Sequence, residues 1–326
     1  MTLKTRMEKI INNSYNNIGG MIVRKDGKTI YEYYDKECTA FSHFHVFSVT
    51  KSIISILIGI AMDKGYLQSI NQNILEFFPD YTVRRGEKTI QHITLRDMLT
   101  MTAPYKYKSE AYEDYFTSNN WVNCSLDLLG GKGTTGEFRY TPIIGPDIFS
   151  GILQKVTGES VLDFAIKYLF SPLDISVAGN VVFQNKEEQL AWYKKKDVRG
   201  WVADRTGVNS AGWGLNLTTM EMAKIGQLYL SDGMWEGKQI VSSDWIQEST
   251  MEHSRCNQRK LSYGYLWWII DEKEHSYAAL GDGGNVIYIN TKKNIVVAIA
   301  SFFIPHAKDR IKLIKTYIEP LCEECI

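Results

Sequence analysis

The residues best suited to chemistry are Ser48 and Lys51, which lie in the apolar segment 47–57. Side chains three positions apart share one face of a helix, so this spacing predicts the Ser48 hydroxyl beside the Lys51 amine. An unpaired buried ammonium is costly, so Lys51 must either find partners or lose its proton. A helix that begins at Ser48 adds positive potential, which favours an alkoxide. The pattern therefore predicts a serine nucleophile next to a lysine base.

Two further segments are candidates for the same site. Tyr140 precedes a predicted helix over 147–156, and a phenol can relay protons if a nearby ammonium lowers its pKa. The run Ala279–Gly284 places three glycines in a strand pattern, where they allow a backbone or a ligand to approach closely. A structural tyrosine and a simple bulge or turn remain the alternative interpretations.

The elements that must position these residues follow from periodicity and turn signals. A hairpin is predicted first, with Asp26-Gly27 in its turn, followed by a buried helix over 46–67 and a mainly helical region up to residue 204. A helix over 219–230 and another capped by Ser243 come next. Strands are then predicted over 263–270, 277–280, 285–290 and 295–303, before a last helix over 308–321.

This order predicts an α/β (α+β) fold in which one antiparallel sheet is assembled from both ends of the chain and flanked by helices. We assign residues 1–64 plus 205–326 to this α/β/α sheet domain and residues 65–204 to a mainly helical insertion. A ligand site is expected in the cleft between the two parts.

Five motifs occur in a fixed order, and together they resemble the serine β-lactamase-related family. They are Ser48-x-x-Lys51, Phe-x-Tyr140, Ala-Gly-Trp213-Gly-Leu, Tyr263-Gly-Tyr-Leu-Trp-Trp268 and Leu-Gly281-Asp-Gly-Gly284. The segment 212–233 is also similar to that family. The serine β-lactamase-related family includes class C β-lactamases, penicillin-binding D-alanyl-D-alanine peptidases, related esterases and nylon-oligomer hydrolases. The resemblance covers most of the chain and implies a β-lactamase/transpeptidase-like fold.

The resemblance also implies roles for single residues. Ser48 would be the acylated nucleophile, Lys51 its base or proton relay, and Tyr140 the second acid/base. The oxyanion hole would be formed by the backbone N–H groups of Ser48 and Asp282, on the strand segment that contains Ala279 and Gly281. Aromatic residues are expected to line part of the pocket, namely Tyr105, Tyr112, Trp201 and Trp213.

Two positions depart from the family pattern. The second motif is commonly Tyr-x-Asn, but this chain has Pro142 in place of the Asn; the third motif usually has a cation before its glycine, but here Leu280 precedes Gly281. We therefore expect a serine hydrolase that forms an acyl-enzyme on a small ester, amide or lactam, with esterase or amidase chemistry favoured over efficient β-lactamase activity. The alternative is a penicillin-binding or ligand-sensing module that is acylated without efficient turnover.

Other chemistries find less support in the sequence. An α/β-hydrolase needs a Gly-x-Ser-x-Gly elbow, and the chain has no strict one. His43-x-His45 lacks the continuation of a metal site, and Cys322-x-x-Cys325 lacks a second pair, so neither a metal nor a cofactor is expected. The Ser118-Asn119-Asn120 run is kept as a second choice for the proton relay.

Composition limits the partners. The 37 Lys+Arg balance the 37 Asp+Glu, which gives no electrostatic footprint for nucleic acid or an acidic membrane. The apolar runs are shorter than the roughly 20 residues of a membrane span. The N-terminal residues do not resemble a secretory leader, and the five scattered cysteines do not form a disulfide framework. A cytoplasmic enzyme with a small-molecule substrate is expected, and the sequence carries no prediction of oligomeric state.

Overall fold

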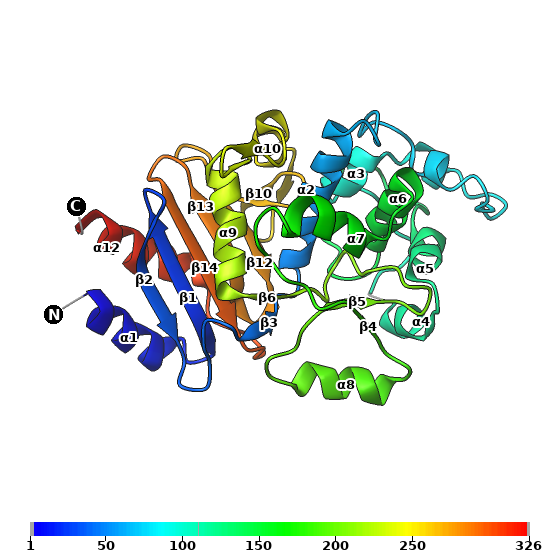
Figure 1. The fold of residues 1–326 in the computed structure, drawn as a ribbon. Coiled ribbons are helices and arrows are strands. Elements are labelled where there is room, and N and C mark those ends of the chain that lie inside the picture. The colour runs from blue at the N-terminus through cyan, green and yellow to red at the C-terminus, as the bar shows by residue number, and fades with distance from the viewer. Residues whose placement is uncertain (1–2, 110, 325–326) are drawn as a thin grey trace.

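A single antiparallel sheet is the centre of the computed structural model, which describes residues 3–109 and 111–324. Its eight strands are ordered β2-β1-β14-β13-β12-β11-β10-β9 (Figure 1). The strands are β1 (Ile18–Lys25), β2 (Lys28–Tyr34), β9 (Ser254–Cys256), β10 (Leu261–Tyr263), β11 (Trp268–Asp271), β12 (Ser276–Gly281), β13 (Asn285–Asn290) and β14 (Ile295–Ser301). Because β1 pairs with β14, strands from the two ends of the chain are neighbours in the sheet, next to the edge strand β2.

The central strands bury both of their faces. Along β14, Val297 and Ile299 face one apolar cluster while Val296 and Ala298 face the other, as the period-two alternation of a strand requires. All seven residues of β14 and all six of β13 are buried. The sequences of these strands are therefore mostly apolar along their whole length, and helices must cover the sheet on both sides.

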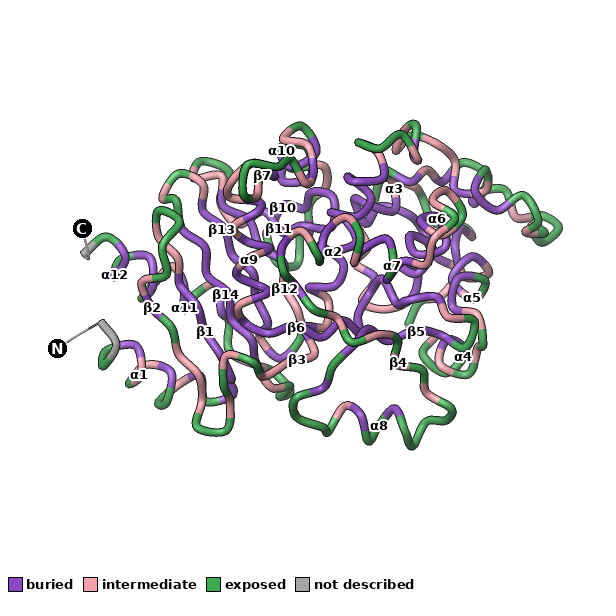
Figure 2. Tube along the Cα trace, in the orientation of Figure 1, coloured by how far each residue is buried: buried purple, intermediate pink, exposed green. Residues whose placement is uncertain are grey.

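Helices form a layer on each face of the sheet (Figure 1). One face packs against α1 (Leu3–Ser14) and the C-terminal helical segment, which consists of α11 (Arg310–Leu313), η5 (Ile314–Ile318) and α12 (Glu319–Glu324). The other face packs against α9 (Thr219–Leu230) and α2 (Val49–Asp63). Figure 2 shows α2 and the central strands buried along most of their length. The expected α/β/α arrangement is confirmed.

A group of mainly helical elements lies beside the sheet, beyond α2 (Figure 1). It contains η1 (Ile74–Phe77), η2 (Thr89–His92), α3 (Leu95–Leu99), α4 (Tyr112–Thr117), α5 (Trp121–Leu128), α6 (Asp147–Thr157), α7 (Val161–Ala165) and η3 (Ile166–Phe170). The short strands β4 (Asn180–Val182) and β5 (Trp201–Ala203) pair in parallel, and α8 (Lys186–Lys194) protrudes between them. The remaining elements are β3 (His43–His45), which pairs with β6 (Asn216–Thr218), β7 (Met234–Trp235), β8 (Lys238–Gln239), α10 (Ser243–Ser249) and η4 (Asp282–Gly284).

Two sequence expectations differ from the structure. The single strand predicted over 263–270 is divided into β10 and β11, because Gly264 to Trp267 turn away and Leu266 takes a φ of 62°. The Leu266 amide then donates to the Leu99 carbonyl at 3.0 Å, which ties this turn to α3. Helix α1 was not predicted, and the helix expected to be capped by Ser243 is capped by Ser242 instead.

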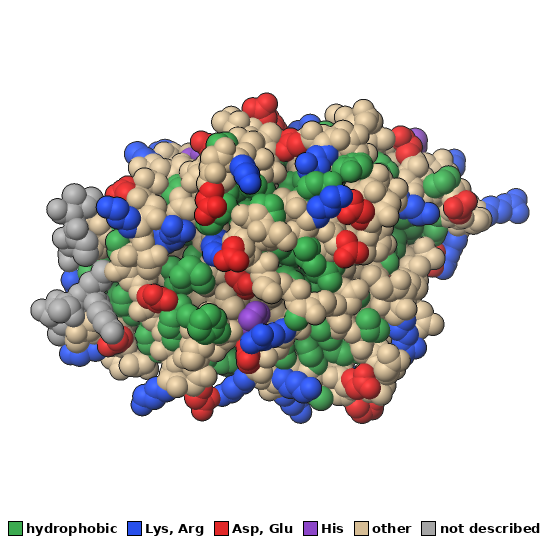
Figure 3. All heavy atoms as spheres, viewed as in Figure 1, with side chains coloured by type: hydrophobic (Ala, Val, Ile, Leu, Met, Phe, Trp, Pro, Cys, Tyr) green, Lys and Arg blue, Asp and Glu red, His purple; other side chains and the backbone are tan. Residues whose placement is uncertain are grey.

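Charges of both signs are interspersed on the face of the molecule drawn in Figure 3, with no region of a single sign. Within residues 3–109 and 111–324, no helix is long and apolar enough to cross a membrane.

Candidate active site

Ser48 lies at the N-cap of α2, directly after a strained backbone position. Phe47 has a φ of 50°, a conformation that side-chain-bearing residues rarely adopt and that often marks functional sites. The Ser48 amide makes no backbone hydrogen bond within the described part of the chain. The hydroxyl therefore lies at the positive end of a 15-residue helix, with a free N–H group beside it.

Lys51 lies in the first turn of the same helix and is 1% exposed. Its Nζ atom is 3.0 Å from Ser48 Oγ, so the two side chains meet as the i, i+3 spacing predicts. The same Nζ donates to the carbonyl oxygens of Pro142 at 2.6 Å and Gly212 at 2.8 Å. We call the oxygens of Ser48, Pro142 and Gly212 the lysine socket.

The lysine socket suits both protonation states of the amine. An ammonium has three N–H donors, one for each oxygen. A neutral amine keeps two N–H donors for the two carbonyls and directs its lone pair at the Ser48 hydroxyl. Proton transfer between the hydroxyl and the amine therefore requires no rearrangement of the surroundings.

The sequence reasoning missed the role of Pro142. Its side chain cannot replace the amide that the Tyr-x-Asn pattern would supply, but its backbone carbonyl contacts Lys51 Nζ directly. Backbone acceptors leave no signal in residue type, so only the fold could reveal this contact.

The two carbonyl-bearing segments of the lysine socket are packed against each other. A methyl group added to Gly212 would lie 3.2 Å from the Pro142 carbonyl oxygen. Asp147, at the start of α6, accepts a hydrogen bond from the Ala211 amide at 2.7 Å and another from the Tyr115 hydroxyl at 2.5 Å. A buried carboxylate therefore fixes the segment that presents the Gly212 carbonyl.

Tyr140 lies against both members of the Ser-Lys pair. Lys51 Nζ is 5.2 Å from the centre of its ring. Burial raises the pKa of Tyr140 to about 12, although the nearby Ser48 hydroxyl opposes this rise. The phenol is thus protonated near neutral pH. The adjacent Arg139 amide donates to the Met101 carbonyl at 2.7 Å, which holds this segment in place.

The predicted oxyanion segment approaches the nucleophile segment very closely. A methyl group added to Gly281 would lie 2.2 Å from the Val46 carbonyl oxygen, so only glycine fits at this point. The buried Asn285 side chain bridges the two segments, because its Nδ2 donates to the Asp282 carbonyl at 2.7 Å and to the His45 carbonyl at 3.3 Å. The backbone around Asp282 is therefore held at a fixed position relative to Ser48.

A second set of buried contacts holds the loop that contains Asp282 and Gly283. Asn17 Nδ2 donates to the Gly283 carbonyl at 2.7 Å and to the Phe302 carbonyl at 2.8 Å. The Asn17 side-chain oxygen in turn accepts from the Arg310 guanidinium, which is 3% exposed. The loop that carries Asp282 is thus tied to β1 and to the C-terminal helical segment.

The other predicted site residues take different positions. Ala279 is fully buried in β12, and Asp282 is exposed, next to the glycines of η4. Of the four expected pocket aromatics, Trp201 is fully buried and its indole N–H donates to the Ser210 carbonyl at 2.8 Å. Tyr105 and Trp213 are also buried, whereas Tyr112 is 42% exposed. Trp201 therefore belongs to the core and offers no free ring face to a ligand.

The alternative sites are engaged in structural contacts. The Asn120 side chain caps α5 by accepting from the Asn123 amide at 2.8 Å, and Asn119 accepts from Arg205 at 2.9 Å. His45 Nε2 accepts from the Gly214 amide at 3.0 Å, and burial lowers the pKa of this imidazole to about 3.

The metal and thiol motifs of the sequence lie partly outside the residues that the structure describes. In residues 3–109 and 111–324, no group of three or more His, Cys, Asp or Glu side chains could hold a metal ion. Cys322 is buried, and Cys325 lies outside the described residues.

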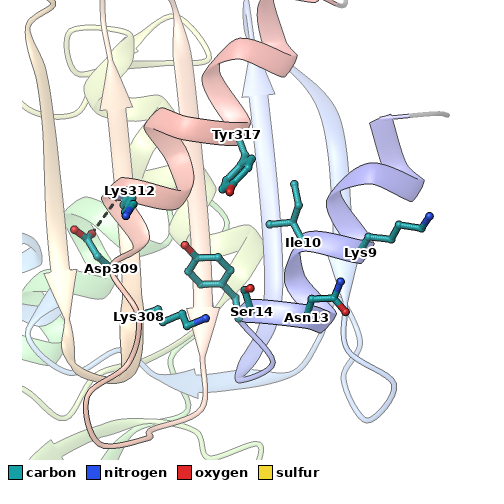
Figure 4. A pocket seen from close by; sticks show the side chains of 9 residues that line it. Lys9, Ile10, Asn13, Ser14, Lys308, Asp309, Lys312 and Tyr317 are labelled. Atoms are coloured by element: carbon teal, nitrogen blue, oxygen red, sulfur yellow. Dashed lines mark hydrogen bonds between the residues drawn. The ribbon is translucent and has the colours of Figure 1, made fainter.

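A cavity of about 500 Å³ lies far from this chemistry, between α1 and the C-terminal helical segment (Figure 4). It is on the face of the sheet opposite α2. Lys9, Lys308 and Lys312 line it, but Figure 4 shows their ammonium groups well separated rather than directed at one point. Converging charges would be needed to bind a single anion, and these side chains do not supply them.

Comparisons with known proteins agree with the geometry. A family model described as Beta-lactamase matches residues 7–308. The 6-aminohexanoate-dimer hydrolase of Paenarthrobacter ureafaciens is 20% identical over 328 residues, which covers 94% of this chain and 76% of that protein. The octameric penicillin-binding protein homologue of Pyrococcus abyssi has a TM-score of 0.69 and 20% identity, covering 96% of this chain and 77% of the other. A family VIII carboxylesterase has a TM-score of 0.70 and 13% identity, covering 100% and 98%.

Proposed function

This chain belongs to the β-lactamase family and is a serine hydrolase, and on that premise we propose that Ser48 is acylated by a small ester, amide or lactam and is then released by water. The family and the β-lactamase/transpeptidase-like fold expected from the sequence are both confirmed. The observation that carries the proposal is the lysine socket, which places a buried amine 3.0 Å from the Ser48 hydroxyl.

In the acylation step, Ser48 Oγ attacks the substrate carbonyl carbon while its proton passes to Lys51 Nζ. The negative charge that develops on the carbonyl oxygen is stabilised by the N–H groups of Ser48 and Asp282. The bond to the leaving alcohol or amine then breaks, and that group departs with a proton. Water attacks the resulting ester in the same way, so one substrate and one water give an acid and an alcohol or amine.

Lys51 is the base in this scheme, and Tyr140 is the acid. A phenol with a pKa of about 12 holds its proton near neutral pH and can donate it to the leaving group, but it cannot accept the serine proton. The phenolate that forms then recovers a proton from the Lys51 ammonium, which returns both groups to their starting states. The two carbonyls of the lysine socket leave a neutral amine with its lone pair facing the hydroxyl. The geometry thus supports Lys51 as the general base and Tyr140 as the general acid.

Esters and open-chain amides are the substrates that we favour over β-lactams. Support comes from a relative whose name gives 6-aminohexanoate dimer as its substrate and from a fold neighbour named as a carboxylesterase. The motif before Gly281 also lacks the cation that usually accompanies the family pattern. We further propose a cytoplasmic location, because Cys38, Cys124 and Cys256 form no disulfide in the described part of the chain.

The decisive experiment compares two serine variants of the same helix on p-nitrophenyl acetate. Ser48→Ala should abolish hydrolysis, whereas Ser55→Ala, two turns further along α2, should retain it. Mass spectrometry after treatment with a fluorophosphonate should locate the adduct on Ser48. Hydrolysis that survives in Ser48→Ala would overturn the proposal, and a stable Ser48 adduct without turnover of any ester or amide would favour the acylated binding module instead.

A further inference from the structure

Phe303 is a large apolar side chain that is left 55% exposed next to the proposed active site. It follows β14, and its ring centre lies 5.4 Å from that of Phe47. On its other side, a methyl group added to Gly283 would lie 3.0 Å from the Phe303 Cα atom. Phe47 precedes Ser48, and Gly283 follows Asp282. Phe303 therefore contacts the neighbours of both proposed oxyanion donors.

Aromatic side chains continue from this point into a small cleft of about 40 Å³. Phe47, Phe302 and Phe303 line the cleft together with Trp192 and Tyr193 of α8. The His45 ring also lines it, with its centre 3.8 Å from that of Phe47 and 4.8 Å from that of Trp192. Burial keeps His45 uncharged near neutral pH. Lys195, Lys196 and Asp197 also line the cleft but are exposed to solvent, and Lys196 is paired with Glu37.

An exposed aromatic ring beside a cleft of this kind favours an apolar ligand. Single exposed apolar residues are common on protein surfaces and need no special role. Phe303 differs from them in two respects. Its ring is continuous with the aromatic residues that line the cleft, and it contacts the residues next to Ser48 and Asp282, whose N–H groups would hold the reacting carbonyl. Ligand sites are concave and largely apolar, with a few polar groups that fix the orientation of the ligand.

We propose that Phe47, Phe303 and the adjoining cleft form a subsite for an uncharged apolar arm of the substrate, an alkyl or aryl group attached to one side of the scissile bond. This inference rests on the proposed function, because the arm is positioned by the carbonyl that Ser48 attacks. It narrows the substrate class from any small ester or amide to one that carries an apolar chain.

Two ester series test the subsite. In one, p-nitrophenyl esters extend the acyl chain from acetate to octanoate; in the other, acetate esters extend the alcohol from methyl to octyl. Burial of one methylene group changes affinity by about fourfold, so in one of the two series kcat/KM should rise about twofold to fourfold per methylene for the first groups added. It should then level off once the cleft of about 40 Å³ is filled. Phe303→Ala should flatten this rise, and Phe303→Leu should retain most of it.

A matched control separates the subsite from a general surface effect. Phe41 is 79% exposed in the loop before β3 and does not line the cleft, so Phe41→Ala should leave the chain-length dependence as in the wild type. Because Phe303 is more than half exposed, Phe303→Ala should melt within a few degrees of the wild type, and a loss of selectivity can then be assigned to the site.

The outcomes are distinguishable. If Ser48→Ala is inactive but the wild-type kcat/KM does not change with chain length in either series, the serine hydrolase assignment stands and the subsite is wrong. The subsite is equally refuted if Phe303→Ala keeps the wild-type slope. If Ser48→Ala retains activity, the proposed function itself has failed.

Discussion

Gly281→Ala is the substitution for which the structure gives the sharpest expectation. Gly281 ends β12 with a φ of −124° and a ψ of 153°, a conformation that alanine adopts without strain. The only obstacle is space, because the new methyl carbon would lie 2.2 Å from the Val46 carbonyl oxygen. That oxygen belongs to the backbone, so it cannot turn aside as a flexible side chain would.

The required displacement can be estimated from atomic sizes. Non-bonded carbon and oxygen atoms rarely approach closer than about 3.2 Å, so the two backbones must separate by roughly 1 Å. Val46 is two residues from Ser48, and Gly281 adjoins Asp282, so the separation widens the gap between the proposed oxyanion donors. Loss of one such donor costs about 10²- to 10³-fold in kcat, or roughly 3 to 4 kcal/mol of barrier. We expect kcat to fall by on the order of 100-fold while KM changes little.

The assay is steady-state hydrolysis of a p-nitrophenyl ester by the variant, together with its melting temperature. Gly27→Ala serves as the control, because Gly27 has a φ of 74° with no atom within 4 Å of the added methyl group. This control carries backbone strain of about 1 kcal/mol, far from Ser48, and should keep the wild-type kcat. A folded Gly281→Ala variant with kcat within threefold of the wild type would refute the placement of the oxyanion hole.

Three further predictions concern the groups around the nucleophile. Lys51→Arg and Lys51→Ala should each lower kcat/KM by more than about 10³-fold, because a guanidinium does not deprotonate near neutral pH; more than a tenth of the activity in the arginine variant would contradict Lys51 as the base. Tyr140→Phe should lower kcat by about 10²-fold and leave the shape of the pH profile between pH 6 and 10 unchanged, since the pKa of this phenol is raised to about 12. Loss of an alkaline limb in that range would show that the phenol ionises. Burial raises the pKa of Asp147 from 3.8 to about 6, so the folded chain binds more protons than the unfolded chain between these values, and its free energy of unfolding should decrease as pH rises through this window. Measured by urea denaturation, the free energy of unfolding of Asp147→Asn should decrease less over this pH window than that of the wild type. An identical pH dependence in the two proteins would exclude a contribution from Asp147.

The contact between Ser48 and Lys51 was predictable because it is local. Helical spacing alone brings their atoms together, and the structure has them 3.0 Å apart. Helix α9 and strand β13 were likewise predicted with the bounds that the structure shows, because each has a clear periodicity and a clear cap or turn. Local patterns of this kind are what a sequence records directly.

The Pro142 and Gly212 carbonyls could not have been predicted, because any residue offers a backbone oxygen and only the tertiary fold selects which ones meet Lys51. The exposure of the aromatic residues could not be predicted for a related reason. Trp201 and Tyr112 look equally suited to a pocket wall, yet one is fully buried and the other is 42% exposed. Burial depends on which elements cover a side chain, and those elements are distant in sequence.

The pairing of β1 with β14 also determines when the site can form during synthesis. Ile18 pairs with Ser301, and the proposed oxyanion donors are divided between Ser48, near the start of the chain, and Asp282, near its end. A ribosome-bound chain that stops before residue 282 holds the Ser-Lys pair but lacks the second N–H group. Contacts between residues so distant in sequence also form late in folding. The nascent chain should therefore remain catalytically inactive until its last strands enter the sheet.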